Sequence, residues 1–422
     1  MGIIPIMKPL DRVLAEIDSS EGNMVQTMIE MIGIPAVAPE SGGLGEERKA
    51  DYLMPKLAGF DEVVRIDVPD NFDPSIMRPN ILARKIGKKD GTVWIVAHMD
   101  VVPAGDPSKW DNPPFEPILK DGSIYGRGTE DNGQALISSL FAALPYLGEE
   151  LGGMSIGLAY VSDEETTSLM GIGYLIDHGY FSHDDVVVVP DWGSPGGSKI
   201  WLSEKSLVWV KFDVVGRSVH GSTPHKGLNA FRASAYFMAD LIDTLESRFS
   251  ERNELFSPPF STFEPTKSSA TVENVNTIPG THSFCIDVRL LPTYSIDDVM
   301  DVCREVAKRH EKDGLRIIVT ELQRNVSGSV SSPDSIGFKA LSDAVETITG
   351  SRPAPAGTGA ATCANFFRLA DFDAYVWQCG GGTLHEPNEH VVISNLMTDC
   401  KVFATLFHSL CLKGEDGDQT GE

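Results

Sequence analysis

Apolar runs in the first half of the chain end directly in polar side chains. Residues 93–97 and 186–189 contain no polar side chain, a pattern typical of strands buried on both faces of a parallel sheet. His98 follows the first run, and Asp191 follows the second run after one proline. Because open α/β folds bind ligands at the carboxyl ends of their strands, the pattern predicts that these two side chains lie at one edge of a sheet.

The spacing of apolar positions divides the chain into three parts. Strands are expected at 62–68, 79–86, 92–99, 155–161 and 185–189, and helices at 24–32, 46–57 and 132–147, so residues 1–204 indicate an α/β domain with a mainly parallel sheet. From residue 205 the order becomes strand, helix, two strands, helix and strand, which predicts an inserted α+β sandwich over 205–324. The α/β pattern then resumes over 325–422.

Composition limits the binding partners and the cellular location that can be expected for this chain. A chain of 422 residues with 41% hydrophobic content is long enough for two domains with real cores. The formal charge of −25 argues against nucleic acid and against an anionic membrane as partners. The six cysteines form no CxxC pair and lie in apolar segments, as expected for reduced thiols. The chain also has no signal-peptide pattern and no long apolar run, so a cytoplasmic location is expected.

Histidine and carboxylate side chains cluster where strands are expected to end. His98, Asp100, Glu164, Glu165, Asp191 and His385 together offer the nitrogen and oxygen ligands that zinc favours. Pro387 opposes a helix at the last of these histidines, so a loop ligand is expected there. Taken alone, each short motif also has an ordinary structural explanation, such as a surface turn.

Four carboxylates carry more specific expectations. Asp100 lies two residues after His98, on the same side of an extended strand, where it can accept a hydrogen bond from the imidazole. Asp131 precedes a predicted helix, so it is expected to act as an N-cap, as a carboxylate that bridges two ions, or as both. Neighbouring side chains diverge, so Glu164 and Glu165 are suited to different tasks, one as a metal ligand and one as a general base. A solvated acidic turn is the alternative for this pair.

The order of these motifs resembles that of a known enzyme family. HMD (98–100), GRGTED (126–131), SDEE (162–165), the aspartate at 191, GRSVHGSTPHKGLNA (216–230) and HEPNE (385–389) are similar to the motifs of the dinuclear zinc metallopeptidases. That family includes succinyl-diaminopimelate desuccinylase, acetylornithine deacetylase, aminoacylase, glutamate carboxypeptidase and related di- and tripeptidases. The resemblance implies a zinc-exopeptidase-like catalytic domain in two parts, 1–204 and 325–422, with a lid and dimerisation domain at 205–324.

The resemblance also implies a role for each site residue. It implies two zinc ions with shared ligands: His98, Asp191 and one oxygen of Asp131 for one ion, and Glu165, His385 and the other oxygen of Asp131 for the second. Glu164 would be the general base, and Asp100 would orient His98. Cobalt or manganese would suit the same ligands.

The resemblance extends to the inserted domain and to the substrate. His220 corresponds to a histidine that stabilises the oxyanion, from a neighbouring subunit in dimeric members, so a homodimer through the lid is expected. Substrate contacts are implied for four residues: Asn276, Arg289, Thr358 and Gly359. The expected substrate is an N-acyl amino acid or a short peptide. Aspartate at 191 is more typical of the di- and tripeptidases than of the deacylases, and both activities stay open. The alternative from another class is a catalytically silent relative that binds metal or peptide.

Overall fold

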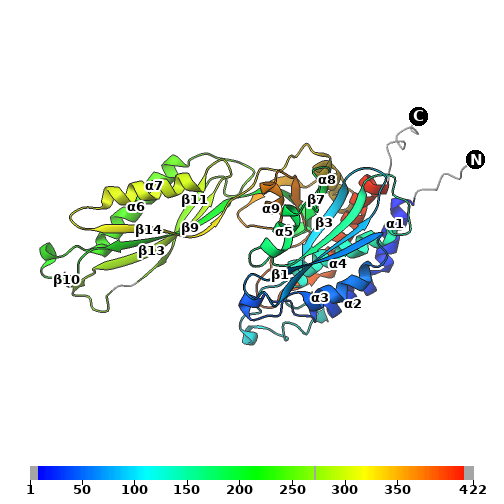
Figure 1. Cartoon of the computed structure of the whole chain (residues 1–422), viewed down its shortest axis with the longest axis horizontal. Coiled ribbons are helices and arrows are strands. Elements are labelled where there is room, and N and C mark those ends of the chain that lie inside the picture. Colours follow the sequence, from blue (N-terminus) through cyan, green and yellow to red (C-terminus); the bar gives the residue numbers. More distant parts are fainter. Residues whose placement is uncertain (1–7, 270–271, 413–422) are drawn as a thin grey trace, which may run out of the picture. The chain divides into compact units, whose positions relative to one another are not determined.

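The structure is a computed structural model that describes residues 8–269 and 272–412, and it divides into two compact units (Figure 1). Unit 1 comprises residues up to Leu202, then Ser331–Pro355, and the chain from Thr362 onward. Unit 2 comprises Ser203–Val330 and Ala356–Ala361. Residues 356–361 pack with unit 2 because their backbone carbonyls accept hydrogen bonds from it, for example Gly359 O from Arg289 Nη1 at 2.7 Å.

Unit 1 is built on a mixed sheet in the order β1-β2-β6-β3-β7-β16-β8-β15. The four central strands β6, β3, β7 and β16 are parallel, and every residue of these strands is buried. The strands are β1 (Glu62–Pro69), β2 (Met77–Lys85), β3 (Thr92–His98), β6 (Ser155–Val161), β7 (Val186–Val189), β8 (Lys199–Glu204), β15 (Ala354–Thr358) and β16 (Ala374–Val376). This is the mainly parallel α/β sheet that the apolar runs predict.

Helices cover both faces of this sheet. Unit 1 also contains a separate small sheet of three strands. The helices of unit 1 are α1 (Leu10–Ser19), α2 (Glu21–Ile32), α3 (Glu47–Leu53), α4 (Gln134–Ala143), α5 (Tyr174–Asp177), α8 (Ile336–Thr349), α9 (Ala364–Leu369) and α10 (Ile393–Phe407). The small sheet consists of β4 (Ile118–Lys120), β5 (Ser123–Tyr125) and β17 (His390–Val392). Helix α4 is buried along its whole length between the sheet and α10.

Helix α4 begins later than the sequence predicts. Helical spacing starts at Asn132, but Asp131 and Asn132 have non-helical backbone angles within the turn η4 (Thr129–Gly133). The regular helix starts at Gln134. The residues before it are held instead by hydrogen bonds to a distant loop, so tertiary contacts override the local helical pattern here.

Unit 2 is a sheet of four antiparallel strands, in the order β11-β13-β9-β14, with helices α6 and α7 on one face (Figure 1). Its elements are β9 (Ser206–Val215), β10 (Val219–His220), α6 (Ala230–Arg248), β11 (Thr262–Ser268), β12 (Thr277–Ile278), β13 (Thr281–Leu290), α7 (Ile296–His310) and β14 (Arg316–Asn325). Burial alternates along β9 and β13, because alternate side chains face the helices and the remainder face outward.

Candidate functional site

The candidate ligands of unit 1 gather where parallel strands end. His98 is the last residue of β3, Glu164 and Glu165 follow β6, and Asp191 follows β7. Because β3 pairs in parallel with both β6 and β7, these side chains emerge at the same edge of the sheet. Two loops from other parts of the chain add Asp131 and His385 to the same place.

Asp131 lies between the two histidines, with one carboxylate oxygen toward each. His98 Nε2 is 2.8 Å from Asp131 Oδ1, and His385 Nε2 is 3.0 Å from Asp131 Oδ2. His98 Nε2 also lies 3.2 Å from Asp191 Oδ1, while His385 Nε2 lies 3.0 Å from Glu165 Oε2. The side chains therefore form two groups that share Asp131. Its carboxylate acts neither as an N-cap nor as a solvated surface group.

The donor set fits divalent cations. Two combinations bring one ligand atom from each residue within 4.8 Å of one another, namely His98 with Asp131 and Glu165, and His98 with Glu164 and Asp191. Four carboxylates thus surround two imidazoles in a largely buried place. Buried carboxylates repel one another and require compensating positive charge, which bound cations would supply.

The electrostatics of these groups reflect the same crowding. Burial raises the pKa of Glu164 well above its usual range, and the charge of Asp191 adds to the effect. Burial and the charge of Asp131 raise the pKa of Glu165 to about 7. Hydrogen bonds to Asp131 and Glu165 raise the pKa of His385 to about 10. Without a cation, Glu164 and Glu165 thus hold protons more readily than exposed glutamates do.

Asp100 holds the main chain of the two glutamates. The Glu164 and Glu165 N–H groups donate to its two carboxylate oxygens at 3.1 and 2.9 Å. His98 Nδ1 lies 3.0 Å from the main-chain oxygen of Asp100 and 3.5 Å from its carboxylate. The nearer Asp100 acceptor for His98 Nδ1 is therefore the carbonyl oxygen. The Asp100 carboxylate binds the main-chain N–H groups of the two glutamates directly.

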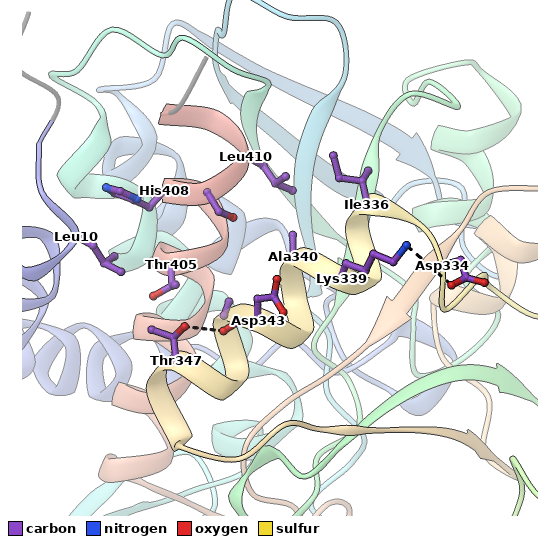
Figure 2. A pocket seen from close by; sticks show the side chains of 12 residues that line it. Leu10, Asp334, Ile336, Lys339, Ala340, Asp343, Thr347, Thr405, His408 and Leu410 are labelled. Carbon is purple, nitrogen blue, oxygen red and sulfur yellow. Dashed lines mark hydrogen bonds and ion pairs between the residues drawn. The ribbon is translucent and has the colours of Figure 1, made fainter. Parts of the chain in front are cut away.

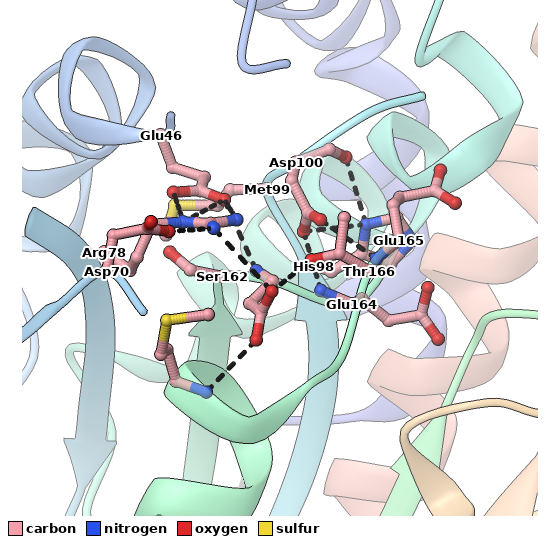
Figure 3. A network of polar contacts seen from close by, with 12 residues as sticks. Glu46, Asp70, Arg78, His98, Met99, Asp100, Ser162, Glu164, Glu165 and Thr166 are labelled. Atoms are coloured by element: carbon pink, nitrogen blue, oxygen red, sulfur yellow. Dashed lines mark hydrogen bonds and ion pairs between the residues drawn. The ribbon is translucent and has the colours of Figure 1, made fainter. Parts of the chain in front are cut away.

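A buried ionic network lies next to the turn that contains Glu164 and Glu165 (Figure 3). The Arg78 side chain is fully buried, with Nη2 at 2.6 Å from Glu46 Oε1 and Nη1 at 2.7 Å from Asp70 Oδ2. Asp163 Oδ1 is 3.6 Å from Arg78 Nη1, and the Asp163 N–H donates to Glu46 at 3.3 Å. The network anchors the turn at Asp163. Figure 3 shows the side chains of Glu164 and Glu165 extending away from it.

Sequence reasoning assigned no role to Arg78, Glu46 or Glu389, although all three side chains are buried around the site. The signal for Arg78 is a charged residue three positions before the apolar run 81–83. Glu389 stood in the HEPNE motif, where His385 accounted for the chemistry. Local patterns do not reveal which distant groups such side chains contact.

The candidate residues of unit 2 lie in two places. The β10 strand that contains His220 pairs with β12, and the Gly221 N–H donates to Asn276 O at 2.6 Å. His220 and Asn276 are both exposed. Arg289 lies near the end of β13, donates to Gly359 O and pairs with Asp287. Thr358 O accepts a hydrogen bond from the Lys205 N–H at 2.9 Å.

A separate groove in unit 1 lies between α8 and the C-terminal end of α10 (Figure 2). Its lining includes Ile336, Lys339, Asp343 and Thr405, and no candidate ligand. Figure 2 shows only a surface pair of Lys339 with Asp334 and a local bond of Thr347 to the α8 main chain. The edge of the main sheet is therefore the better candidate for chemistry.

Comparisons with known proteins agree with the geometry. The model of peptidase family M20/M25/M40 matches residues 94–409. An uncharacterized metallohydrolase of Methanocaldococcus jannaschii is 35% identical over 395 residues, which cover 89% of this chain and 96% of that protein. The succinyl-diaminopimelate desuccinylase of Rickettsia felis is 26% identical over 377 residues, covering 87% and 94%.

Solved structures share the fold. Aminopeptidase PepT from Bacillus cereus superposes with a TM-score of 0.72 at 17% identity, covering 92% of this chain and 98% of that one. Among the described residues, no helix is both long and apolar enough to cross a membrane. With a family match over most of its length, the chain belongs to peptidase family M20/M25/M40 and is a metal-dependent hydrolase that acts on amide or peptide bonds.

Proposed function

We propose that this protein hydrolyses the amide bond of an N-acyl amino acid or a short peptide at a centre of two zinc ions in unit 1. The observation that carries the proposal is the position of Asp131, whose Oδ1 faces His98 and whose Oδ2 faces His385. A carboxylate placed in this way can bridge two ions. Asp191 would complete one ion's ligands, and Glu165 would complete those of the second.

The chain itself supplies the proton chemistry. Bound zinc ions would polarise a substrate carbonyl and lower the pKa of a water molecule. Glu164 is held at its N–H by Asp100, and its side chain lies beside His98 and Asp191. Its pKa, raised by burial, suits a base that accepts a proton from the attacking water and returns it to the leaving amine.

Two substrate classes remain within this proposal. The desuccinylase relative supports an N-acyl amino acid, while the likeness to an aminopeptidase is one of fold. In the family pattern, aspartate at 191 favours a short peptide. In both classes the bond that breaks is an amide, and the product that appears is a free amine.

Unit 2 would supply contacts to the substrate, and we propose that a second copy of the chain contributes some of them. Ser206 of β9 pairs with Leu290 of β13, so Arg289 lies at the end of the sheet where the chain enters unit 2. His220 and Asn276 lie at the opposite end, beyond the start of β13. Arg289 lies eight positions after Thr281 along β13, a distance of roughly 27 Å.

This separation supports a homodimer. The carbonyl of a small substrate occupies one point, and side chains at opposite ends of a sheet of this length do not both reach it from one chain. Arg289, with Thr358 and Gly359 beside it, would bind the substrate of its own chain. His220 and Asn276 would act on the substrate of the partner, where His220 donates a hydrogen bond to the oxyanion.

A substrate panel tests the proposed function. We expect the zinc-loaded protein to release free amine from at least one member of a set of N-succinyl amino acids, N-acetyl amino acids, dipeptides and tripeptides. Chelation should abolish the activity, and added zinc should restore it. Absence of hydrolysis across the panel, in protein that retains bound zinc, would instead favour the catalytically silent alternative.

A further inference from the structure

Two loops that are distant in the sequence hold the ligands on either side of the candidate centre. One is residues 126–131, which ends in Asp131, and the other is residues 383–390, which contains His385. Neither ligand lies in a regular helix or strand. Their relative position therefore depends on contacts between the loops rather than on the sheet.

Glu389 binds four residues of the first loop through its carboxylate. Oε1 accepts the N–H groups of Glu130 and Asp131, each at 3.0 Å. Oε2 accepts the Gly128 N–H at 3.0 Å and Arg127 Nη1 at 2.6 Å. Glu389 is fully buried, so these four hydrogen bonds replace its hydration and fix the main chain at Asp131.

The first loop binds the second in return. Glu130 Oε2 accepts the Thr383 N–H at 2.9 Å and also the Thr383 hydroxyl. The His390 N–H donates to the oxygen of that hydroxyl at 3.2 Å. The Thr383 hydroxyl thus joins Glu130 to the far end of its own loop, with His385 in between.

The second loop adopts a conformation that needs such support. His385 has a φ of 62° and Asn388 also has a φ of 62°, in the left-handed region that residues other than glycine rarely adopt. Such conformations persist where the surroundings fix them. Pairing of His390 with Tyr125 and the stacking of their rings, with centroids 4.7 Å apart, join the second loop to β5, the strand that directly precedes the first loop.

We propose that Glu389, Glu130 and Thr383 form a reciprocal clasp that positions Asp131 and His385 for metal binding. The three are positioning residues, because each acts through a ligand and contacts no substrate. Glu389 fixes Asp131, which faces both histidines, whereas Glu130 and Thr383 fix only the loop of His385. The inference rests on the proposed two-zinc centre and assigns the clasp mainly to the ion held by His385.

Zinc titration against a chromogenic chelator tests the clasp, because it measures the affinity of each ion without an activity assay. Thr383→Val removes the hydroxyl and keeps a similar shape, and Thr383→Ser retains the hydroxyl. We expect Thr383→Val and Glu130→Gln to weaken the second ion by about 10–100-fold, the usual cost of removing a group that orients a ligand. Affinity for the first ion should change little. Thr383→Ser should restore the second ion, and Glu389→Gln should weaken both.

The control variant is Glu346→Gln, the same change at a half-exposed glutamate of α8 that pairs with Arg352. It should match the wild type in both affinities, and thermal unfolding of every variant separates loss of metal from loss of fold. Equal zinc affinities for Thr383→Val, Thr383→Ser and the wild type would overturn the clasp and leave the proposed function standing. If the wild type bound one ion, the two-zinc proposal would fall, and the comparison between the Thr383 variants would still decide the clasp.

Discussion

In unit 1, side chains from four other segments converge around Asp131, whereas in unit 2 the candidate residues lie at opposite ends of one sheet. His98 and His385 both lie within 3.0 Å of the Asp131 carboxylate. His220 and Arg289 are separated by the length of β13. Unit 1 therefore contains a complete set of candidate ligands, while the candidate residues of unit 2 form two separate groups.

The two units differ because their sheets differ. The parallel strands of unit 1 place all their carboxyl ends at one edge, so side chains from distant segments gather there. The antiparallel strands of unit 2 place successive strand ends at alternate ends of the sheet. Metal binding should therefore depend on unit 1 alone, and catalysis should depend on unit 2 and on assembly.

The largest effect should come from the candidate base in unit 1. Glu164→Gln keeps the size of the side chain and removes its ability to accept a proton, so we expect kcat to fall by about 10²–10⁴-fold. Zinc content, measured by elemental analysis, should stay close to that of the wild type. Glu165→Gln is the matched neighbour and should weaken zinc binding instead. Equal loss of zinc in both variants would contradict the separate roles.

Arg78→Met should be the most destabilising change in unit 1. It leaves the buried carboxylates of Glu46, Asp70 and Asp163 without their shared cation, which typically costs about 3–5 kcal/mol. Denaturant unfolding measures this free energy. Arg304→Met, which removes an exposed arginine of α7 that pairs with Asp301, is the control and should cost less than about 1 kcal/mol. Similar losses of unfolding free energy in both variants would show that the buried network does not stabilise the turn at Asp163.

The next effect tests unit 2. His220→Ala should lower kcat by about 10²–10³-fold, with a smaller change in KM, because an oxyanion donor acts mainly in the transition state. Zinc content should be unchanged. A normal kcat would exclude the oxyanion role.

Mixing two inactive variants tests whether the histidine comes from the partner. Under conditions of subunit exchange, His220→Ala and Glu164→Gln should together recover part of the activity, since one mixed site has both intact residues. If proven heterodimers stay inactive, His220 does not act on the substrate of the partner chain. The separation of His220 from Arg289 would then need another explanation.

Arg289→Ala should have the smallest effect. Arg289 already pairs with Asp287 and binds Gly359 O, and it is expected to contact the substrate rather than the reacting atoms. Loss of one charged hydrogen bond corresponds to about 1.5–3 kcal/mol, so KM should rise by at least about 10-fold with kcat nearly unchanged. A fall in kcat with constant KM would place Arg289 in the transition state instead.

The sequence predicted most of the sheet and the candidate ligands, for a physical reason. His98 and Asp191 each follow an apolar run, and such runs report burial in a parallel sheet directly. Glu389, Arg78 and Thr383 act through hydrogen bonds to segments far away in the chain, which no local pattern records. The split of His220 from Arg289 also depends on strand order, which the spacing of apolar residues does not determine.

The most direct test of the central claim is a crystal structure of the zinc-loaded protein with anomalous diffraction recorded at the zinc absorption edge. Two anomalous peaks about 3.5–4 Å apart, the separation typical of two-metal hydrolases, should flank the Asp131 carboxylate, one beside His98 and the other beside His385. A single peak, or a pair of peaks that Asp131 does not bridge, would contradict the account.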